Sequence, residues 1–389
     1  MKSNFILGCT LLLISISTFA QGDKISLNGY VKNMQTVYAP DDAAMLQSNI
    51  LSDNLIHNRL NFRYYASSNI TVAVEARNRF MYGEIVKLFP DYGAMLDKDP
   101  GFLDLSKTIA SGDGYALHTM IDRLYVDYIK GDFQARIGRQ RINWGINMVW
   151  NPNDIFNTFN YFDFDYEERP GTDAVKLQYY TGVASSAELV YQPGDSLQAS
   201  AFAGMYRLNK WGYDFQFLGG YINEDLVVGT GWSGNISNAG FRGEATYFRD
   251  NENFSDTTGQ VVASVSVDYM FRNSFYLHAG LLYNSKGTTG KASREGLLLL
   301  NQEMSVKTLT PAKTSLFAQA SYPITPLLSA DISLIANPHD KSHFVSPTVS
   351  YSLSQNIEAM ATGQLFSGDR GTEYGSIGQL FFLRIKYSF

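Results

Sequence analysis

Apolar and polar residues alternate one by one through most of this sequence, in runs of about 10 to 13 residues. Within residues 261–269, valine, alanine and tyrosine fill the odd positions, whereas serine or aspartate stands at positions 264, 266 and 268. A period of two places the apolar side chains on one face of a β-strand. Strands of this length can cross a membrane when tilted, whereas the strands of soluble sandwiches are usually shorter.

We expect eighteen strands, near residues 25–37, 55–66, 70–81, 117–130, 133–143, 172–181, 184–192, 197–208, 211–221, 225–235, 238–249, 260–272, 275–286, 313–323, 326–336, 343–353, 356–367 and 377–389. Their connections fall into two alternating classes. Every second connection is a short turn, and the others include all long segments: 38–54, 82–116, 144–171, 250–259, 287–312 and 368–376. Short turns at one end and long loops at the other are typical of outer-membrane barrels. The fold class expected is therefore an all-β, transmembrane, antiparallel β-barrel with short periplasmic turns and long extracellular loops.

The last residues of the chain form an alternating apolar series. Its members are Phe381, Leu383, Ile385, Tyr387 and Phe389. This series resembles the carboxyl-terminal signal by which bacterial outer-membrane barrels are recognised for insertion. We therefore expect the barrel-assembly machinery and outer-membrane lipid as partners, and the bacterial outer membrane as the location.

The first residues predict a cleavable signal peptide. Lys2 precedes an uncharged apolar run from Phe5 to Phe19, and Thr18-Phe19-Ala20 offers small residues at the cleavage positions. We place the signal peptide at residues 1–20 and a single barrel domain at residues 21–389. Cleavage there would remove the only cysteine, so a disulfide-stapled secreted domain is excluded. The remaining chain carries more acidic than basic residues, which disfavours nucleic-acid binding.

Arginines recur on the polar face of successive strands in the first half of the chain. Because charges facing lipid cost several kcal/mol near the bilayer midplane, we place them inside the barrel. Two of them, Arg139 and Arg141, have the opposite parity to Arg136, and a bulge at Gly138 would turn them inward. The predicted pore-lining set is Arg59, Arg63, Arg77, Arg79, Arg123, Arg136, Arg139 and Arg141. These arginines either attract anions and polar sugars or pair with neighbouring carboxylates.

Residues 144–171 are too rich in aromatic side chains to extend freely into water. Burying these rings against the inner wall would stabilise the segment, and its acidic residues would then face the arginines across a constriction. The predicted constriction loop includes Trp144, Trp150, Asn151, Asp154, Asp163, Asp165, Glu167 and Glu168. The alternative is an extracellular loop that packs locally and narrows nothing.

Three stretches carry a family resemblance. Residues 138–145 (GRQRINWG), 150–157 (WNPNDIFN) and 169–177 (RPGTDAVKL) resemble a pattern in porin-like outer-membrane proteins similar to the alginate-export type. The resemblance implies an eighteen-stranded monomeric barrel with one loop folded into the pore. Acidic residues interrupt the arginine series here, so alginate is not implied as the solute.

The main function expected is passive diffusion of small hydrophilic solutes or saccharides, without enzymatic activity. Two alternatives stay open. A polysaccharide-export or surface-assembly barrel would share the same fold. A lipid hydrolase would need a lumenal histidine facing a serine, and the candidates are His57, His118 and His278. We expect no cofactor, and no metal site, because His339 and His343 have no further ligand nearby in the sequence.

Overall fold

The computed structural model describes residues 24–41, 50–99, 101–158, 161–165, 167, 169, 171–196, 198–251, 254–255, 258–293 and 305–389. The expected signal peptide and Glu168 lie outside these residues, so both stay predictions. Within the described residues the chain forms nineteen strands: β1 (Ile25–Ala39), β2 (Leu51–Tyr65), β3 (Ile70–Gly83), β4 (Ser106–Gly112), β5 (Tyr115–Lys130), β6 (Phe133–Gln140), β7 (Thr172–Gly182), β8 (Ser185–Gln192), β9 (Ala201–Lys210), β10 (Tyr213–Ile222), β11 (Asp225–Ile236), β12 (Ala239–Asp250), β13 (Gln260–Met270), β14 (Tyr276–Asn284), β15 (Thr314–Thr325), β16 (Leu328–Asn337), β17 (Ser342–Ser354), β18 (Ile357–Ser367) and β19 (Gln379–Ser388).

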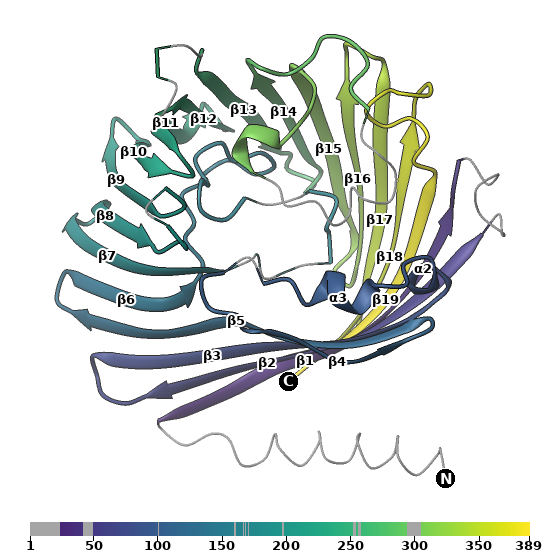
Figure 1. The fold of residues 1–389 in the computed structure, drawn as a ribbon. Coiled ribbons are helices and arrows are strands. Elements are labelled where there is room, and N and C mark those ends of the chain that lie inside the picture. Colours follow the sequence, from purple (N-terminus) through teal and green to yellow (C-terminus); the bar gives the residue numbers. More distant parts are fainter. Residues whose placement is uncertain are drawn as a thin grey trace.

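The strands form a closed antiparallel ring (Figure 1). Each strand pairs with the next along the chain, except that β3 pairs with β5. The ring closes where β1 pairs with β19, from Tyr30 opposite Ser388 to Ala39 opposite Gln379. Eighteen strands make this ring, and each overlaps one of the expected segments, with ends that differ by a few residues. The predicted closed antiparallel barrel of eighteen strands is therefore confirmed.

Side-chain exposure separates the two faces of the wall. On β19, Phe381, Leu383, Ile385 and Tyr387 are 47–56% exposed, whereas Leu380, Phe382 and Arg384 between them are buried. The exposed apolar face is the one that lipid covers in a membrane barrel. Phe389 lies just beyond β19, where its backbone N–H donates to the Gly29 carbonyl oxygen at 3.0 Å.

The segment expected to be one long loop, 82–116, contains structure that the sequence did not indicate. It holds two one-turn helices, α2 (Glu84–Lys87) and α3 (Tyr92–Leu96), and the strand β4. Residues 124–130 of β5 pair with β6, and residues 115–120 of the same edge pair with β4. Strand β6 ends at Gln140, short of the expected residue 143, and so leaves part of the β5 edge without a partner. Strand β4 pairs with that part of β5. An unpaired edge in the wall would be costly in a membrane.

Helices contribute little to the described chain. The third helical segment is the 3-10 turn η3 (Val306–Thr308). None of the helices in the described residues is long and apolar enough to span a membrane.

Candidate functional site

The described residues between β6 and β7 lie inside the ring (Figure 1). We call residues 141–158, 161–165, 167, 169 and 171 the interior segment. Trp144 is fully buried, and its indole Nε1 donates to Glu188 on β8 at 3.1 Å. Trp150 is also buried and packs edge-on against Phe317 of β15, with ring centroids 6.2 Å apart. The aromatic side chains therefore fasten the segment to the inner wall.

Glu244 of β12 anchors the first half of the interior segment. One carboxylate oxygen accepts the backbone N–H groups of Ile146 and Asn147, each at 2.5 Å, and the other accepts that of Asn153 at 2.9 Å. The neighbouring Thr246 donates to the Asn153 side chain at 2.6 Å. Sequence reasoning missed Glu244, although its position on the inward face follows from the alternation of β12.

Aromatic packing holds the second half. Phe162 contacts Phe344 of β17 and Phe366 of β18, with ring centroids 5.0 and 5.9 Å apart. Gln364 of β18 donates to the Phe162 carbonyl oxygen at 2.8 Å. Phe164 packs against Phe382 of β19, with centroids 4.7 Å apart. These contacts involve β17, β18 and β19, whereas the contacts described for the first half involve β8, β12 and β15.

Ion pairs then tie the second half to both ends of the ring. Asp165 lies 2.8 Å from Lys32 of β1 and 3.3 Å from Arg384 of β19. Glu167 lies 3.1 Å from Lys386 of β19 and 3.3 Å from Arg384. Lys32, Arg384 and Lys386 were absent from the expected site, although strand alternation places all three on the inward face.

The placement predicted for these acidic residues was therefore wrong in part. Asp165 and Glu167 do not face the arginines of β2 and β3 from the opposite wall, because they pair with the adjacent strands β1 and β19. Buried carboxylates are stabilised by direct cation partners, which these strands supply.

Two other carboxyl groups of the interior segment lack such close pairing. Burial raises the pKa of Asp163 above its ordinary value, although Arg77 and Arg79 oppose the shift. Burial also raises the pKa of Asp154 to about 7, although the Trp144 backbone N–H, Arg141 and Arg169 oppose it. Asp154 lies 3.9 Å from Arg169 and accepts the Trp144 N–H at 3.2 Å. Of these carboxyl groups, Asp163 is thus the one whose pKa the arginines of β3 act to lower.

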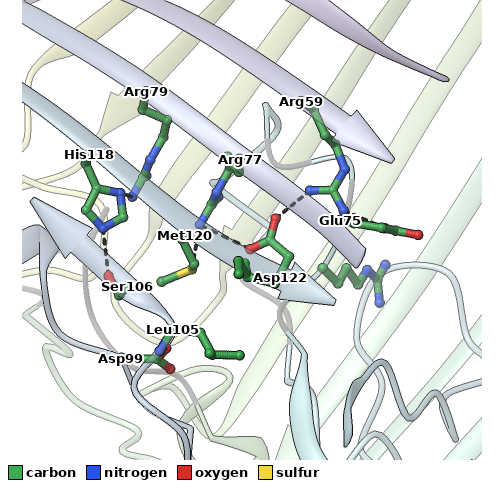
Figure 2. Close-up of polar contacts among 12 residues, drawn as sticks. Arg59, Glu75, Arg77, Arg79, Asp99, Leu105, Ser106, His118, Met120 and Asp122 are labelled. Atoms are coloured by element: carbon green, nitrogen blue, oxygen red, sulfur yellow. Dashed lines mark hydrogen bonds and ion pairs between the residues drawn. The ribbon is translucent and has the colours of Figure 1, made fainter. Parts of the chain in front are cut away.

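The arginines of β2 and β3 form a paired network with β5 (Figure 2). Arg59 contacts Glu75 at 2.7 Å and also binds Asp122. Arg77 lies 3.7 Å from Asp122. The pairing of β3 with β5 shifts between Glu75 and Ala76, so Asp122 bulges from the ladder and is buried beside Arg123. A bulge is thus what brings this carboxylate to the arginines.

Three more of the predicted pore-lining arginines have different surroundings. The Arg63 side chain is 47% exposed and lies 3.7 Å from Glu75. Arg123 donates to the Arg169 carbonyl oxygen of the interior segment at 2.5 Å. Arg136 pairs with Asp127 at 3.0 Å. Arg63 is therefore the most open of these three cations.

The bulge at Gly138 that would turn Arg139 and Arg141 inward is absent, because β5 and β6 pair without a shift from Leu124–Arg139 to Lys130–Phe133. Gly138 instead has φ +115°, and a Cβ there would meet the Leu124 carbonyl oxygen at 2.1 Å. Arg139 is buried between Asp99 at 2.6 Å and Asp173 at 2.8 Å, where it joins the end of β6 to the segment before β4. Arg141 donates to the Asn143 side chain at 2.8 Å.

One histidine does face a serine, as the hydrolase alternative requires. The Ser106 hydroxyl lies 2.7 Å from His118 Nε2, and Arg79 lies 3.2 Å from Nδ1 (Figure 2). A guanidinium only donates, so Nδ1 must accept and the proton of a neutral ring lies on Nε2. A general base needs the reverse arrangement, with its unprotonated nitrogen toward the hydroxyl. The Ser106–His118 pair therefore stabilises the wall and does not match a hydrolase.

Comparisons with known proteins identify the fold. No family model and no curated protein sequence matches this chain. OccAB2 of Acinetobacter baumannii superimposes with a TM-score of 0.60 at 10% identity, over 95% of this chain and 99% of that one. The outer membrane protein OpdK of Pseudomonas aeruginosa gives 0.56 at 10% identity, over 94% and 99%. OprD of the same organism gives 0.55 at 12% identity, over 95% and 97%. At such low identity the likeness shows a shared porin-like barrel fold.

Proposed function

We propose that this protein is an outer-membrane channel through which small hydrophilic solutes or saccharides diffuse passively, and that it is not an enzyme. One observation carries the proposal: a closed ring of strands holds charged side chains on its inward face, and a segment from the middle of the chain is fastened across that interior. A ring of this size encloses a lumen wide enough for water unless inserted segments fill it.

The path we propose runs between the interior segment and the arginine-bearing strands. The contacts of the described residues hold the segment to β5, β8, β10, β11, β12, β13, β15, β17, β18, β19 and β1. Arg59, Arg63, Arg77, Arg79 and Arg136 lie on β2, β3 and β6. These five cations outnumber the carboxylates Glu75, Asp122 and Asp127 that pair with them, so this part of the wall keeps a net positive charge, which raises the local concentration of anions and of solutes with accessible dipoles.

Asp163 supplies the opposite charge in this proposal. When ionised, it would contribute to a field across the path that points from Arg77 and Arg79 toward its carboxylate. A field across a narrow, water-filled passage favours solutes whose dipoles can align with it. Trp144, Trp150, Asn151 and Asp154 then act by holding the segment in place, and Arg139 by sealing the wall.

The experiment that tests the channel is planar-bilayer recording with the refolded chain lacking residues 1–20. We expect discrete conductance steps, because each barrel that inserts into the bilayer adds one water-filled pathway for ions. The reversal potential under a salt gradient then reports the preference for anions or cations. Absence of steps at all voltages and protein concentrations would contradict the proposal.

The remaining predictions of processing and family belong to the same proposal. Export would proceed through cleavage after Ala20, and the exposed face from Phe381 to Tyr387, with Phe389, would be recognised by the barrel-assembly machinery. The resemblance of residues 138–177 to alginate-export barrels supports a channel of that general kind. Neighbouring glycosyltransferase genes would favour polymer export over diffusion.

A further inference from the structure

The inward face of β15, β16 and β17 carries hydroxyl groups near the short turns. Three rows of paired residues cross these strands: Gln319, Ser333 and Ser346; Ser321, Asp331 and Thr348; and Pro323, Ser329 and Ser350. The alternate side chains point outward, since Ile332, Val349 and Tyr351 are 42–50% exposed apolar residues. We call the six serines and threonines of these rows the hydroxyl face.

A buried histidine borders this face. His278 of β14 pairs in register with Gln319, and its ring packs 5.1 Å from Phe317. The residue is 3% exposed, and Gln319 is its polar neighbour across the strand pair. His278 can hydrogen-bond to the Gln319 amide and so borders the hydroxyl face through that side chain.

The charges around the hydroxyl face disfavour anions. Asp331 belongs to its middle row. Asp268 lies opposite His278 in the strand register and is bound by Arg242. The Asp268–Arg242 ion pair carries no net charge. The cations of the arginine-bearing strands lie on β2, β3 and β6, outside β14–β17 in the ring. A solute at this face therefore meets hydroxyl, amide, imidazole and carboxylate groups.

We propose that the hydroxyl face, bordered by Gln319 and the buried His278, forms a binding track for neutral saccharides, an inference that rests on the channel function proposed above. Hydroxyl and amide side chains both donate and accept hydrogen bonds, so they match the mixed donors and acceptors of a sugar. Rows repeated along the lumen provide several weak sites in succession. Passage through a channel requires binding of this kind, strong enough for entry and weak enough for release.

The test compares the native barrel with a variant that removes three hydroxyls: Ser333→Ala, Ser346→Ala and Thr348→Val. Liposome swelling measures the entry of glucose and of maltotriose, and planar bilayers measure the potassium chloride conductance and its block by maltotriose. The control is Ser26→Ala, which removes a hydroxyl on the same face of β1 as Lys32, three strands beyond β17 in the ring. Heat-modifiable gel mobility shows that each variant is folded, and Ser346→Ala alone replaces the triple variant if that one does not fold.

We expect the triple variant to lose about fivefold in maltotriose entry and in blocking affinity, with its conductance and the control unchanged. Unchanged sugar entry and block in a conducting triple variant would overturn the binding track and leave the channel standing. Absence of conductance in the native barrel would instead overturn the channel and the track together. A loss of sugar entry in both the triple variant and the control would also overturn the track, because the effect would not depend on this face.

Discussion

The two halves of the interior segment are held by different kinds of contact. Residues 144–153 attach through backbone N–H groups to Glu244 and through buried rings. Residues 161–167 attach through aromatic stacking and through ion pairs with β1 and β19. Of these ion pairs, those of Glu167 are partly open to solvent, with its side chain 33% exposed.

This difference implies two kinds of response to solution conditions. Salt screens charges that solvent reaches, whereas buried hydrogen bonds are insensitive to ionic strength. A buried carboxyl group with a raised pKa responds to pH instead. The first half of the segment should therefore respond to pH and the end of the second half to salt. Hydrogen exchange of peptides from each half measures both in one experiment.

Removing both halves should have the largest effect. Deleting residues 145–168 takes away the contacts with β12, β15, β17, β18, β19 and β1, and we expect the single-channel conductance to rise about twofold or more, toward that of an unobstructed ring. Unchanged conductance would show that neither half narrows the path.

Glu244→Ala should release the first half only. Three backbone N–H groups lose their acceptor, and local opening should become easier by an amount on the order of 5 kcal/mol. Hydrogen exchange of residues 144–153 should accelerate, while that of residues 161–165 stays near the native rate. Glu244→Gln keeps one acceptor oxygen, so its exchange rate in residues 144–153 should lie between those of the native protein and of Glu244→Ala. Equal acceleration in both halves would mean that the halves are not independent.

Raising the pH should loosen the first half through Asp154, whose pKa is raised to about 7. Between pH 4 and 7 the folded state holds a proton that the open state has released, so stability is full at the acidic end and falls as pH rises. The whole change is up to about 4 kcal/mol, at about 1.4 kcal/mol for each pH unit. Asp154→Asn should reduce this dependence in residues 144–153. A native profile without slope in this range would contradict the raised pKa.

Asp165→Asn should release the second half without affecting the first. Lys32 and Arg384 then lose a buried partner, which costs about 3 kcal/mol. Hydrogen exchange of residues 161–165 should accelerate, and the open-channel current should become noisier. Lys32→Met combined with Asp165→Asn completes a double-mutant cycle. A coupling energy near zero would show that the pair does not fasten the segment.

Glu167→Gln should have the smallest effect, about 0.5 kcal/mol, because its ion pairs with Lys386 and Arg384 are partly exposed. Raising potassium chloride from 0.1 to 1 M should cause the same loss of stability at the end of the second half in the native protein, and no further loss in the variant. An additional effect of salt in the variant would point to another screened pair.

Long-range structure marks the limit of what the sequence could predict. Alternation located every strand of the ring, because side-chain parity is a local property. It did not locate β4, whose formation depends on an edge left open by the early end of β6. Gly138 was a candidate bulge position, but the ladder shifts at Asp122 instead, because glycine conformation and ladder shifts are separate features. Lys32 and Asp165 are 133 residues apart, so no local pattern could pair them.

The contacts of Asp165 also bear on the order of assembly. This residue, from the middle of the chain, forms ion pairs with both the first and the last strand of the ring. Those two strands become neighbours only when they pair and close the ring, so the two ion pairs can be present together only after closure. Assembly would accordingly pass through a stage in which the wall is complete and the passage is still wide. A membrane holding that precursor would leak until the final side chains dock.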